Sequence, residues 1–543
     1  MSLDVSDSPG GSRNGRGPVR VGLAVRAERG PAWVVALARA IESSGEAEMT
    51  VFTLPLGCAP DLPEPERRPG PPLWSLFRAG DAVLQRLVCR SSPRPDAELD
   101  LRRAGFAVQD GFPPGLDVVV CAAGGSPATA LAAETGAPVW WLDHDGGAAW
   151  PEVVSGYAET LRGDEVTSCR LLQLLPGAEA SSVLSIAYFS THPLVATENR
   201  MQLLWKSLPL VVKALRVGGY SATEPEVAPR TVRIPDGGAA LAATLARHVA
   251  RAAWFVGRRL LWREQWCLAV IPIECAATGI APAGGGVTGT TRSVIVPPPD
   301  RYWADPHLVP GGDGRLVLVE EYLYATRRGR IAMLTLDDAG AVTATRTILE
   351  LDGHLSYPSV FEKDGSLYMI PESSDLENLV AYRCVEYPHR WEPEVTLLDG
   401  VRAIDSTIVR HEGRWWLFAT IQEEKWLTPR DTLWVFFSDD PLTGRWTPHA
   451  ANPVVCDARR ARPAGPLFSR GGHLYRPAQD CGRRYGYGIR ISEVVTLTPD
   501  DYVEREVAFM PPPGDGFVAT HTYGCDENSV IADVLRWLPG RRG

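Results

Sequence analysis

The sequence predicts an α/β domain followed by a β-propeller, and two patterns support this division. The second half repeats one phrase four times: an apolar pair, a short polar turn that contains glycine, and a strongly apolar strand. The copies begin at Leu308, Val360, Ile408 and Leu467. Hairpins that recur about every 50 residues are typical of propeller blades. The first half instead alternates apolar runs of strand length with helical patterns, which favours a sheet covered by helices.

Composition excludes several classes of protein. The chain has 543 residues, too many for a single hydrophobic core, and its net charge of -10 argues against nucleic-acid binding. The ten cysteines are scattered without CxxC spacing, so we expect neither a metal site nor a redox motif. Free thiols suit a reducing compartment, and no uncharged run is long enough for a membrane span. We therefore expect a cytoplasmic protein with no transmembrane segment.

The first half divides into three predicted parts. Residues 1–18 are polar and rich in glycine and serine, which predicts a disordered tail. Residues 19–217 alternate strand and helix patterns, which predicts a parallel, Rossmann-like sheet, although no GxGxxG follows the first strand. Residues 218–262 contain a loop punctuated by proline and glycine and then a long helical pattern, which predicts a linker and a helix.

Residues 263–538 are the predicted propeller. After each hairpin the sequence continues into a third strand and a polar outer strand, and four strands per unit are typical of a blade. Four units are clear. A fifth, weaker unit is expected from Arg505 to Trp537, closed by a strand around Trp266 to Ile273. We therefore predict five blades.

Charged and aromatic residues flank the hairpins at positions that should meet at one mouth of the propeller. Asp305, Tyr357, Asp405 and Arg462 begin the innermost strands. The second strands end with a further polar set: Glu320, Glu321, Glu372, Arg476, Gln479 and Asp480. Because inner strands run along the axis, these ends should converge. Few folded proteins collect so many charges without a ligand, so the sequence predicts a binding or catalytic site there.

The ADP tripeptide that contains Asp305, together with SDDPLTGRW at the end of a later blade, resembles the furanosidase propeller superfamily of arabinanases, β-xylosidases, invertases and levansucrases. This resemblance implies three acids that perform glycosyl transfer or hydrolysis. Asp305 would be nucleophile or base, Glu372 the proton donor and Asp405 the orienting acid. The second blade departs from the pattern, because Tyr357 stands between Ser and Pro where an Asp is expected.

Three longer strings carry a second resemblance: SYPSVFEKDGSLYMIPE, IDSTIVRHEGRWWLFAT and ARPAGPLFSRGGHLYRPAQDCGRRYGY. They are similar to the propeller domain at the N-terminus of plant glucosamine inositolphosphorylceramide transferases. They are also similar to bacterial proteins that join this propeller to a formyltransferase-like domain. The resemblance implies a sugar or glycoconjugate partner in an amino-sugar or glycolipid context. In the plant proteins, transfer belongs to a separate glycosyltransferase domain.

The first half is similar to the formyltransferase fold, which uses an Asn-x-His pair and a later Asp around 10-formyltetrahydrofolate. In APVWWLDHDGGAAWPEV, His144 matches the family histidine, but Leu142 stands where the Asn should be. The stretch LLPGAEASSVL lacks the Asp. The resemblance therefore implies a degenerate formyltransferase-like domain.

The leading hypothesis is an enzyme that acts on a sugar or amino-sugar conjugate through Asp305, Glu372 and Asp405, without cofactor or metal. The residues expected to bind the substrate are Glu321, Tyr357, Arg462, Arg476, Gln479, Asp480 and His521. Two alternatives remain open. One is formyl or acyl transfer through His144, which would use 10-formyltetrahydrofolate, and the other is a non-catalytic glycan-binding scaffold.

Overall fold

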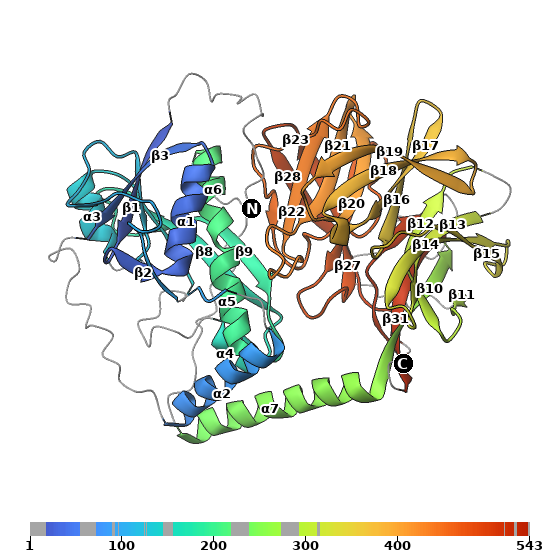
Figure 1. The fold of residues 1–543 in the computed structure, drawn as a ribbon, viewed down its shortest axis with the longest axis horizontal. Coiled ribbons are helices and arrows are strands. Elements are labelled where there is room, and N and C mark those ends of the chain that lie inside the picture. Colours follow the sequence, from blue (N-terminus) through green and yellow to red (C-terminus); the bar gives the residue numbers. More distant parts are fainter. Residues whose placement is uncertain are drawn as a thin grey trace. The chain divides into compact units, whose positions relative to one another are not determined.

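The chain divides into two compact units, Ser2–Ala252 and Ala253–Gly543 (Figure 1). The computed structural model describes residues 18–54, 72–89, 93–95, 97–123, 125, 127–144, 156–218, 238–272, 293–311, 315–514, 516–525 and 529–540. The expected disordered tail, residues 1–18, lies outside these ranges except for its last residue. Most of the expected linker before the long helix lies outside them as well.

The first unit is built on a seven-stranded sheet with the order β5-β3-β1-β6-β7-β8-β9. These strands are β1 (Val19–Val25), β3 (Ala47–Thr53), β5 (Val108–Asp110), β6 (Val118–Cys121), β7 (Val139–Asp143), β8 (Val166–Leu174) and β9 (Ser182–Ser190). A separate pair joins β2 (Arg29–Pro31) to β4 (Glu98–Asp100). The helices are α1 (Ala32–Ser43), α2 (Pro72–Val88), α3 (Ala128–Thr135), α4 (Tyr157–Arg162), α5 (Ala196–Lys206), α6 (Leu208–Val217) and α7 (Gly238–Leu261).

The expectation of a parallel, Rossmann-like sheet is wrong for one edge. Strands β5, β3, β1, β6 and β7 are parallel, as the alternating pattern predicts. Strand β8 is antiparallel to both β7 and β9, so the sheet is mixed. The connection from β8 to β9 is a short turn, whereas a parallel crossover takes about a dozen residues or more. Apolar residues such as Phe52, Val119, Leu131 and Val139 form the core on this sheet.

The described strands of the second unit form five β-sheets, which confirms the predicted five-bladed propeller (Figure 1). The first blade joins β12 (Arg301–Val309), β13 (Arg315–Leu323), β14 (Arg328–Leu336) and β15 (Val342–Leu349). The second joins β16 (Ser356–Lys363), β17 (Ser366–Glu372), β18 (Asn378–Glu386) and β19 (Arg390–Asp399), with the 3₁₀ turn η3 (Ser374–Leu376) between β17 and β18. The third joins β20 (Ala403–His411), β21 (Arg414–Ile421), β22 (Thr432–Ser438), β23 (Thr447–Pro448) and β24 (Val455–Cys456).

The fourth blade joins β25 (Phe468–Arg470), β26 (His473–Asp480), β27 (Gly488–Leu497) and β28 (Tyr502–Met510). The fifth joins β10 (Trp262–Pro272), β11 (Ser293–Ile295), β29 (Phe517–Ala519), β30 (Tyr523–Cys525) and β31 (Ser529–Pro539). Arg505 therefore lies in the outer strand of the fourth blade, which corrects the expected start of the fifth. The reason is that β28 completes the fourth blade by pairing with β27 along most of its length.

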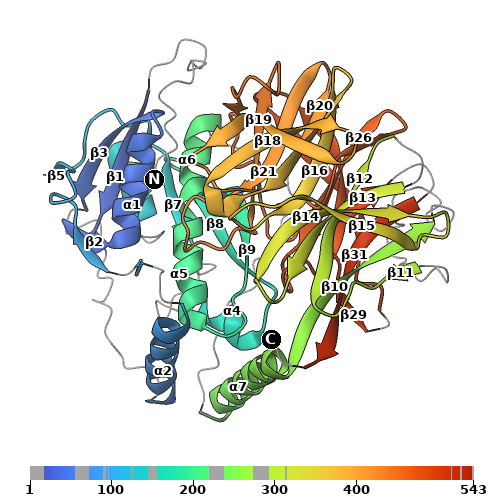
Figure 2. The same cartoon turned by 45° about the vertical axis from the view of Figure 1, so that its right-hand side comes forward.

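Pairing of the two ends of the propeller closes the ring. Strand β10 is antiparallel to β31 from the Trp262–Pro539 pair to the Pro272–Ser529 pair (Figure 2). This confirms the closing strand expected near Trp266, although Ile273 itself lies outside the described residues. Neighbouring blades share apolar cores, and one cluster joins Leu318 and Met333 of the first blade to Met369 and Tyr382 of the second. The blades are thus packed sheet on sheet around their inner strands.

Candidate active site of the propeller

The innermost strands of the first three blades share an unusual backbone feature. Each changes its pairing register, between Ala304 and His307, between Ser356 and Ser359, and between Ile404 and Thr407. Inside each shift lies a residue other than glycine with a left-handed backbone: Asp305 (φ 50°), Tyr357 (φ 43°) and Asp405 (φ 49°). Such a conformation is costly for a residue with a Cβ and persists only where the surroundings hold it. Its repetition in three blades marks these positions as one site.

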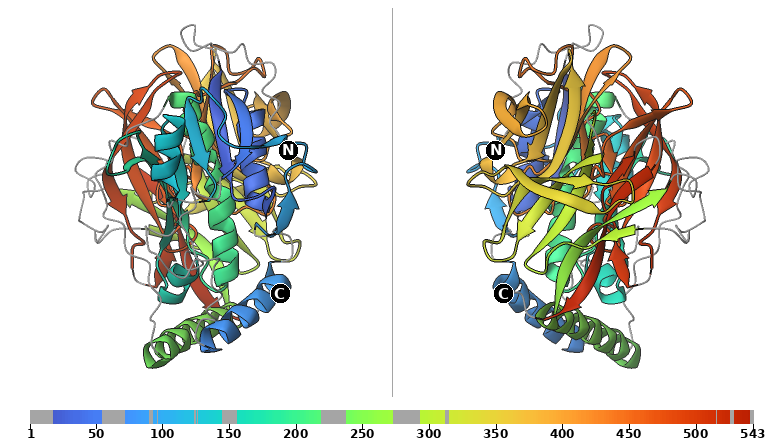
Figure 3. Two further views of the ribbon diagram at one scale, coloured as in Figure 1. Left: turned by 90° about the vertical axis from the view of Figure 1, so that its left-hand side faces the viewer. Right: turned by 90° about the vertical axis from the view of Figure 1, so that its right-hand side faces the viewer.

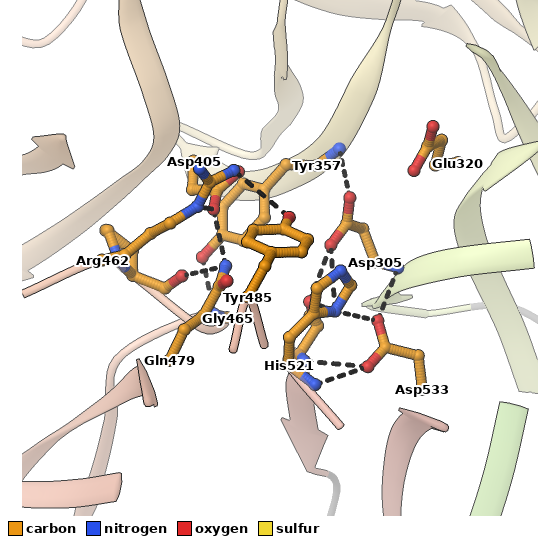
Figure 4. Close-up of polar contacts among 12 residues, drawn as sticks. Asp305, Glu320, Tyr357, Asp405, Arg462, Gly465, Gln479, Tyr485, His521 and Asp533 are labelled. Atoms are coloured by element: carbon orange, nitrogen blue, oxygen red, sulfur yellow. Dashed lines mark hydrogen bonds and ion pairs between the residues drawn. The ribbon is translucent and has the colours of Figure 1, made fainter. Parts of the chain in front are cut away.

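Carboxylates of the preceding blades hold the three left-handed residues. The backbone N–H of Asp305 donates to Asp533 Oδ2 at 3.0 Å, and that of Tyr357 donates to Asp305 Oδ2 at 3.2 Å. The backbone N–H of Asp405 donates to Glu372 Oε2 at 3.3 Å. The acids thus link the fifth, first, second and third blades through one chain of contacts (Figure 4).

Asp405 lies in a buried ion pair. Its Oδ2 accepts a hydrogen bond from Arg462 Nε at 2.5 Å and from Gln479 Nε2 at 2.6 Å. The Arg462 guanidinium also lies 4.0 Å from Glu372 Oε2. Burial raises the pKa of Asp405 to about 7; Arg462 opposes this shift, and the adjacent Glu372 carboxyl adds to it. The Arg462 guanidinium therefore lies close to both carboxyl groups, that of Asp405 and that of Glu372.

Asp305 lies beside a histidine–aspartate pair. Its Oδ1 accepts a hydrogen bond from the Thr522 hydroxyl at 2.7 Å, while His521 Nδ1 lies 2.5 Å from Asp533 Oδ2. Burial raises the pKa of Asp305 to about 6, partly offset by His521. Burial lowers the pKa of His521, but Asp533, Asp305 and Asp405 together raise it, so the net shift is upward. His521 is thus held near its protonated form, stacked on Trp266 at 4.1 Å between ring centres.

The same three groups are the candidates for a metal site within the described residues. Ligand atoms of Asp305, His521 and Asp533 all lie within 4.8 Å of one another. The carboxylate of Asp533, however, already accepts the backbone N–H groups of Asp305, His521 and Thr522. Its oxygens are satisfied by these donors, so the group needs no cation to be stable.

Two tyrosines, Tyr357 and Tyr485, lie between the group around Asp405 and the group around Asp305. The Tyr357 hydroxyl accepts the backbone N–H of Gly465 at 2.6 Å and lies 2.9 Å from the Thr407 hydroxyl. The ring of Tyr485, from the loop between β26 and β27, lies between the Arg462 guanidinium and His521 (Figure 4). Tyr357 therefore fills the position where an acid was expected, and it uses its hydroxyl to fix the fourth blade.

Of the two adjacent acids in the first blade, Glu320 lies on the side of Asp305. Its Oε1 accepts the Tyr302 hydroxyl at 3.0 Å, and burial followed by Asp305 raises its pKa well above the usual range. Glu321 lies on the other face, where it accepts hydrogen bonds from Arg301, Arg330 and Trp303. Successive residues of a strand point to opposite faces, so only one of the pair could reach the axis.

The structure brings together most of the residues expected at the site: Asp305, Tyr357, Glu372, Asp405, Arg462, Gln479 and His521. Arg476 and Asp480 are placed within the fourth blade instead. Arg476 pairs with Glu504 at 2.8 Å and Asp480 with Arg490 at 2.8 Å. The first pair joins β26 to the outer strand β28 and the second joins β26 to β27, so both charges are already paired within the blade.

Sequence reasoning missed Asp533, Thr522 and Tyr485. Asp533 is fully buried in β31 and is the only acid within IADVLRW, so a lone Asp in an apolar strand was the available signal. His144 lies in the other unit. Its Nε2 is 3.0 Å from the Ser207 hydroxyl, and its ring meets Trp33 edge-on. These contacts lend no support to formyl transfer.

Comparison with known proteins finds a family match in the second unit and sequence relatives of the chain. Residues 275–512 match the family model described as Glucosamine inositolphosphorylceramide transferase 1, N-terminal. The matched range falls within the second unit. The glucosamine inositolphosphorylceramide transferase 1 of Arabidopsis thaliana is 37% identical over 214 residues, covering 39% of this chain and 28% of the relative. The protein of that name from Oryza sativa subsp. japonica is 35% identical over 212 residues, covering 38% and 28%.

The chain thus spans little more than a quarter of the length of these relatives. Both are plant proteins, so the resemblance to bacterial fusion proteins stays a prediction, as does a formyltransferase-like origin of the first unit. Among solved structures, the GH43_1 enzyme from Xanthomonas citri complexed with xylose is 13% identical with a TM-score of 0.31, covering 44% of this chain and 87% of that one. An exo-beta-1,3-galactanase from Clostridium thermocellum is 12% identical with a TM-score of 0.31, covering 40% and 55%. Neither similarity bears on the chemistry of the site.

No helix in the described part of the chain is long and apolar enough to cross a membrane. The expected cytoplasmic location stays a prediction.

Proposed function

We propose that the axial site of the propeller cleaves or transfers the glycosidic bond of an amino-sugar conjugate. Asp305 would act as base or nucleophile, and the Glu372–Asp405 pair would supply the proton. The observation that carries this proposal is a pair of buried acidic centres that titrate near neutrality, with pKa values of about 6 for Asp305 and about 7 for Asp405. Glycosyl chemistry needs one carboxyl ionised and one protonated at the same pH.

The contacts around each centre suit these different roles. Asp305 accepts hydrogen bonds from Thr522 and the Tyr357 N–H and faces His521, all of which favour its ionised form. The Asp405 carboxyl lies against that of Glu372, and like charges at this distance favour retention of one proton. Near pH 7, Asp305 would therefore be mostly ionised while the pair still holds a proton.

The charge of the site supports an amino sugar as substrate. Asp305, Asp533 and the Glu372–Asp405 pair, which retains one proton, carry one negative charge more than the two basic groups, Arg462 and His521, can balance. Glu320 adds no charge, because its pKa is raised well above the usual range. A cationic amine would complement this excess. The name of the relatives specifies glucosamine, whose unacetylated form carries such an amine. We therefore propose a glucosamine-containing glycoconjugate as the substrate class.

The test uses the full chain with p-nitrophenyl glycosides of glucosamine and N-acetylglucosamine, assayed for both hydrolysis and transfer to an added alcohol. D305N and E372Q should each lower kcat by about 10²–10⁴-fold, because each removes a group that moves a proton or bonds the sugar. The control is E321Q, because the neighbouring Glu321 faces away from the site, and it should keep full kcat. Full activity in both D305N and E372Q would overturn the assignment.

A second candidate is a non-catalytic glycan-binding module. One observation favours it: both oxygens of Asp305 already accept hydrogen bonds from the protein. Calorimetric titration with glucosamine discriminates the two functions. Binding that D305N weakens, with no turnover by the wild-type protein of any glycoside tested, would establish the binding module instead.

A further inference from the structure

Helix α7 exposes an uninterrupted apolar face. Val249, Ala253, Val256 and Leu260 follow one another at spacings of three or four residues, so they form one row along the helix. Large apolar side chains of α7 with much of their surface in solvent are Val249, Trp254 (72%), Val256, Leu260 (65%) and Leu261 (66%). The exposed face of a helix on a globular protein usually carries charged residues. A contiguous apolar face marks an interaction surface.

Helix α2 repeats this arrangement. Five of its large apolar side chains are exposed: Leu73, Leu76, Val83, Leu84 and Leu87. The opposite face of α2 contacts α7, since Trp74 and Phe77 share one apolar cluster with Leu241 and Leu245. In Figure 1, α2 lies beside the first turns of α7 (further views in Figure 3). On α2 the exposed apolar side chains lie on the face away from this cluster, whereas on α7 the exposed row begins at Val249, four residues after Leu245.

The charges that border these faces are positive. Helix α7 contains four arginines and no acidic residue, in a chain whose net charge is -10. Arg247 and Arg259 are exposed on α7, and Arg78 and Arg86 are exposed on α2.

The acidic residue of α2, Asp81, does not change the excess of positive charge on the two exposed faces. Asp81 is buried and accepts the backbone N–H groups of Ala196 and Thr197 at the start of α5. The exposed charges of both helices are thus arginines.

We propose that α2 and α7 dock the protein onto the surface of an anionic lipid bilayer. A helix with an apolar face and an arginine border lies in the interface plane, with leucine and tryptophan among the acyl chains and arginine at the headgroups. Anionic lipid complements the arginines electrostatically. A second copy of the chain fits this surface less well, because its arginine borders would face arginine. The proposal is independent of the chemistry at the propeller.

Vesicle flotation of the full chain tests the proposal. The wild-type protein should float with vesicles of phosphatidylcholine mixed with phosphatidylserine, and less with phosphatidylcholine alone or at high salt. L76E combined with L260E places charge in both apolar faces and should lower the partition coefficient at least about tenfold. R247Q combined with R259Q should remove most of the preference for anionic vesicles. The control is V495E, because Val495 is an exposed valine of the propeller, and it should float like wild type.

All substituted side chains are exposed, so the variants should keep the thermal transition of wild type, which calorimetry checks. Three outcomes would overturn the proposal: no flotation of wild type with anionic vesicles, flotation unchanged in L76E/L260E, or flotation insensitive to lipid charge. Sedimentation equilibrium tests the alternative that a second copy of the chain binds this surface. A wild-type dimer that L76E/L260E converts to monomer, with no flotation of either, would assign the surface to a second copy.

Discussion

Replacing Arg462 with methionine should destabilise the propeller strongly, because it removes the cation that neutralises a buried pair of acids. The Arg462 side chain is 10% exposed and that of Asp405 is 3% exposed. Methionine fills part of the same space but removes the guanidinium that pairs with Asp405. It also leaves the carbonyl of Pro429 without the Arg462 donor that it has at 3.1 Å.

The magnitude follows from the burial of the pair. Removing one partner of a buried ion pair costs about 3–5 kcal/mol, because the remaining charge stays desolvated. In a domain of this size each kcal/mol lowers Tm by about 2–4 °C. Differential scanning calorimetry of the full chain at neutral pH should therefore show the propeller transition about 6–20 °C lower. The control R390M removes an exposed arginine that pairs with Glu386 and Glu392, and it should cost less than about 1 kcal/mol.

The pH dependence identifies the cause. The pKa of Asp405 is already raised to about 7, and loss of Arg462 raises it further. At about pH 5 Asp405 is protonated in the folded state, so the deficit of R462M should be smaller than at about pH 8. The double variant D405N/R462M should be less destabilised than the sum of the two single variants. A Tm within about 2 °C of wild type, or equal deficits at both pH values, would refute the reasoning.

Three other predictions concern the same site. The folded-state pKa of Asp405, about 7, lies above its unfolded value, so this group makes the protein less stable as pH rises from about 4 to about 7; D405N should flatten the dependence of Tm on pH over that range. In a urea titration, G465A should lower stability by more than about 3 kcal/mol, because its Cβ would clash with the Tyr523 carbonyl and Gly465 has a φ of 122°. The control G413A, at an open turn, should cost about 1 kcal/mol. Y357F leaves the buried N–H of Gly465 without its acceptor and should cost about 1–3 kcal/mol by urea titration, and a cost below the error of the titration would contradict this.

The repeated hairpins made the propeller predictable. The turn glycines Gly365, Gly413 and Gly472 all have left-handed φ values, of 74°, 81° and 84°, which a side chain would resist. Because each hairpin is formed by residues close together in the sequence, its turn and strands can be predicted from a short stretch of chain. The antiparallel pairing of β8 with β7 was less visible, because a pattern of alternating strands and helices does not show in which direction a strand runs.

The repeat pattern was enough to predict the blade number and to place Asp305 and Asp405 on inner strands. Which side chains face one another depends on contacts between blades. A register shift in an inner strand changes the face of every residue beyond it, and carboxylates of the preceding blades hold the residues inside these shifts. That is why Glu320 and not Glu321 lies beside Asp305, and why Asp533, more than two hundred residues away along the chain, bonds to the Asp305 backbone.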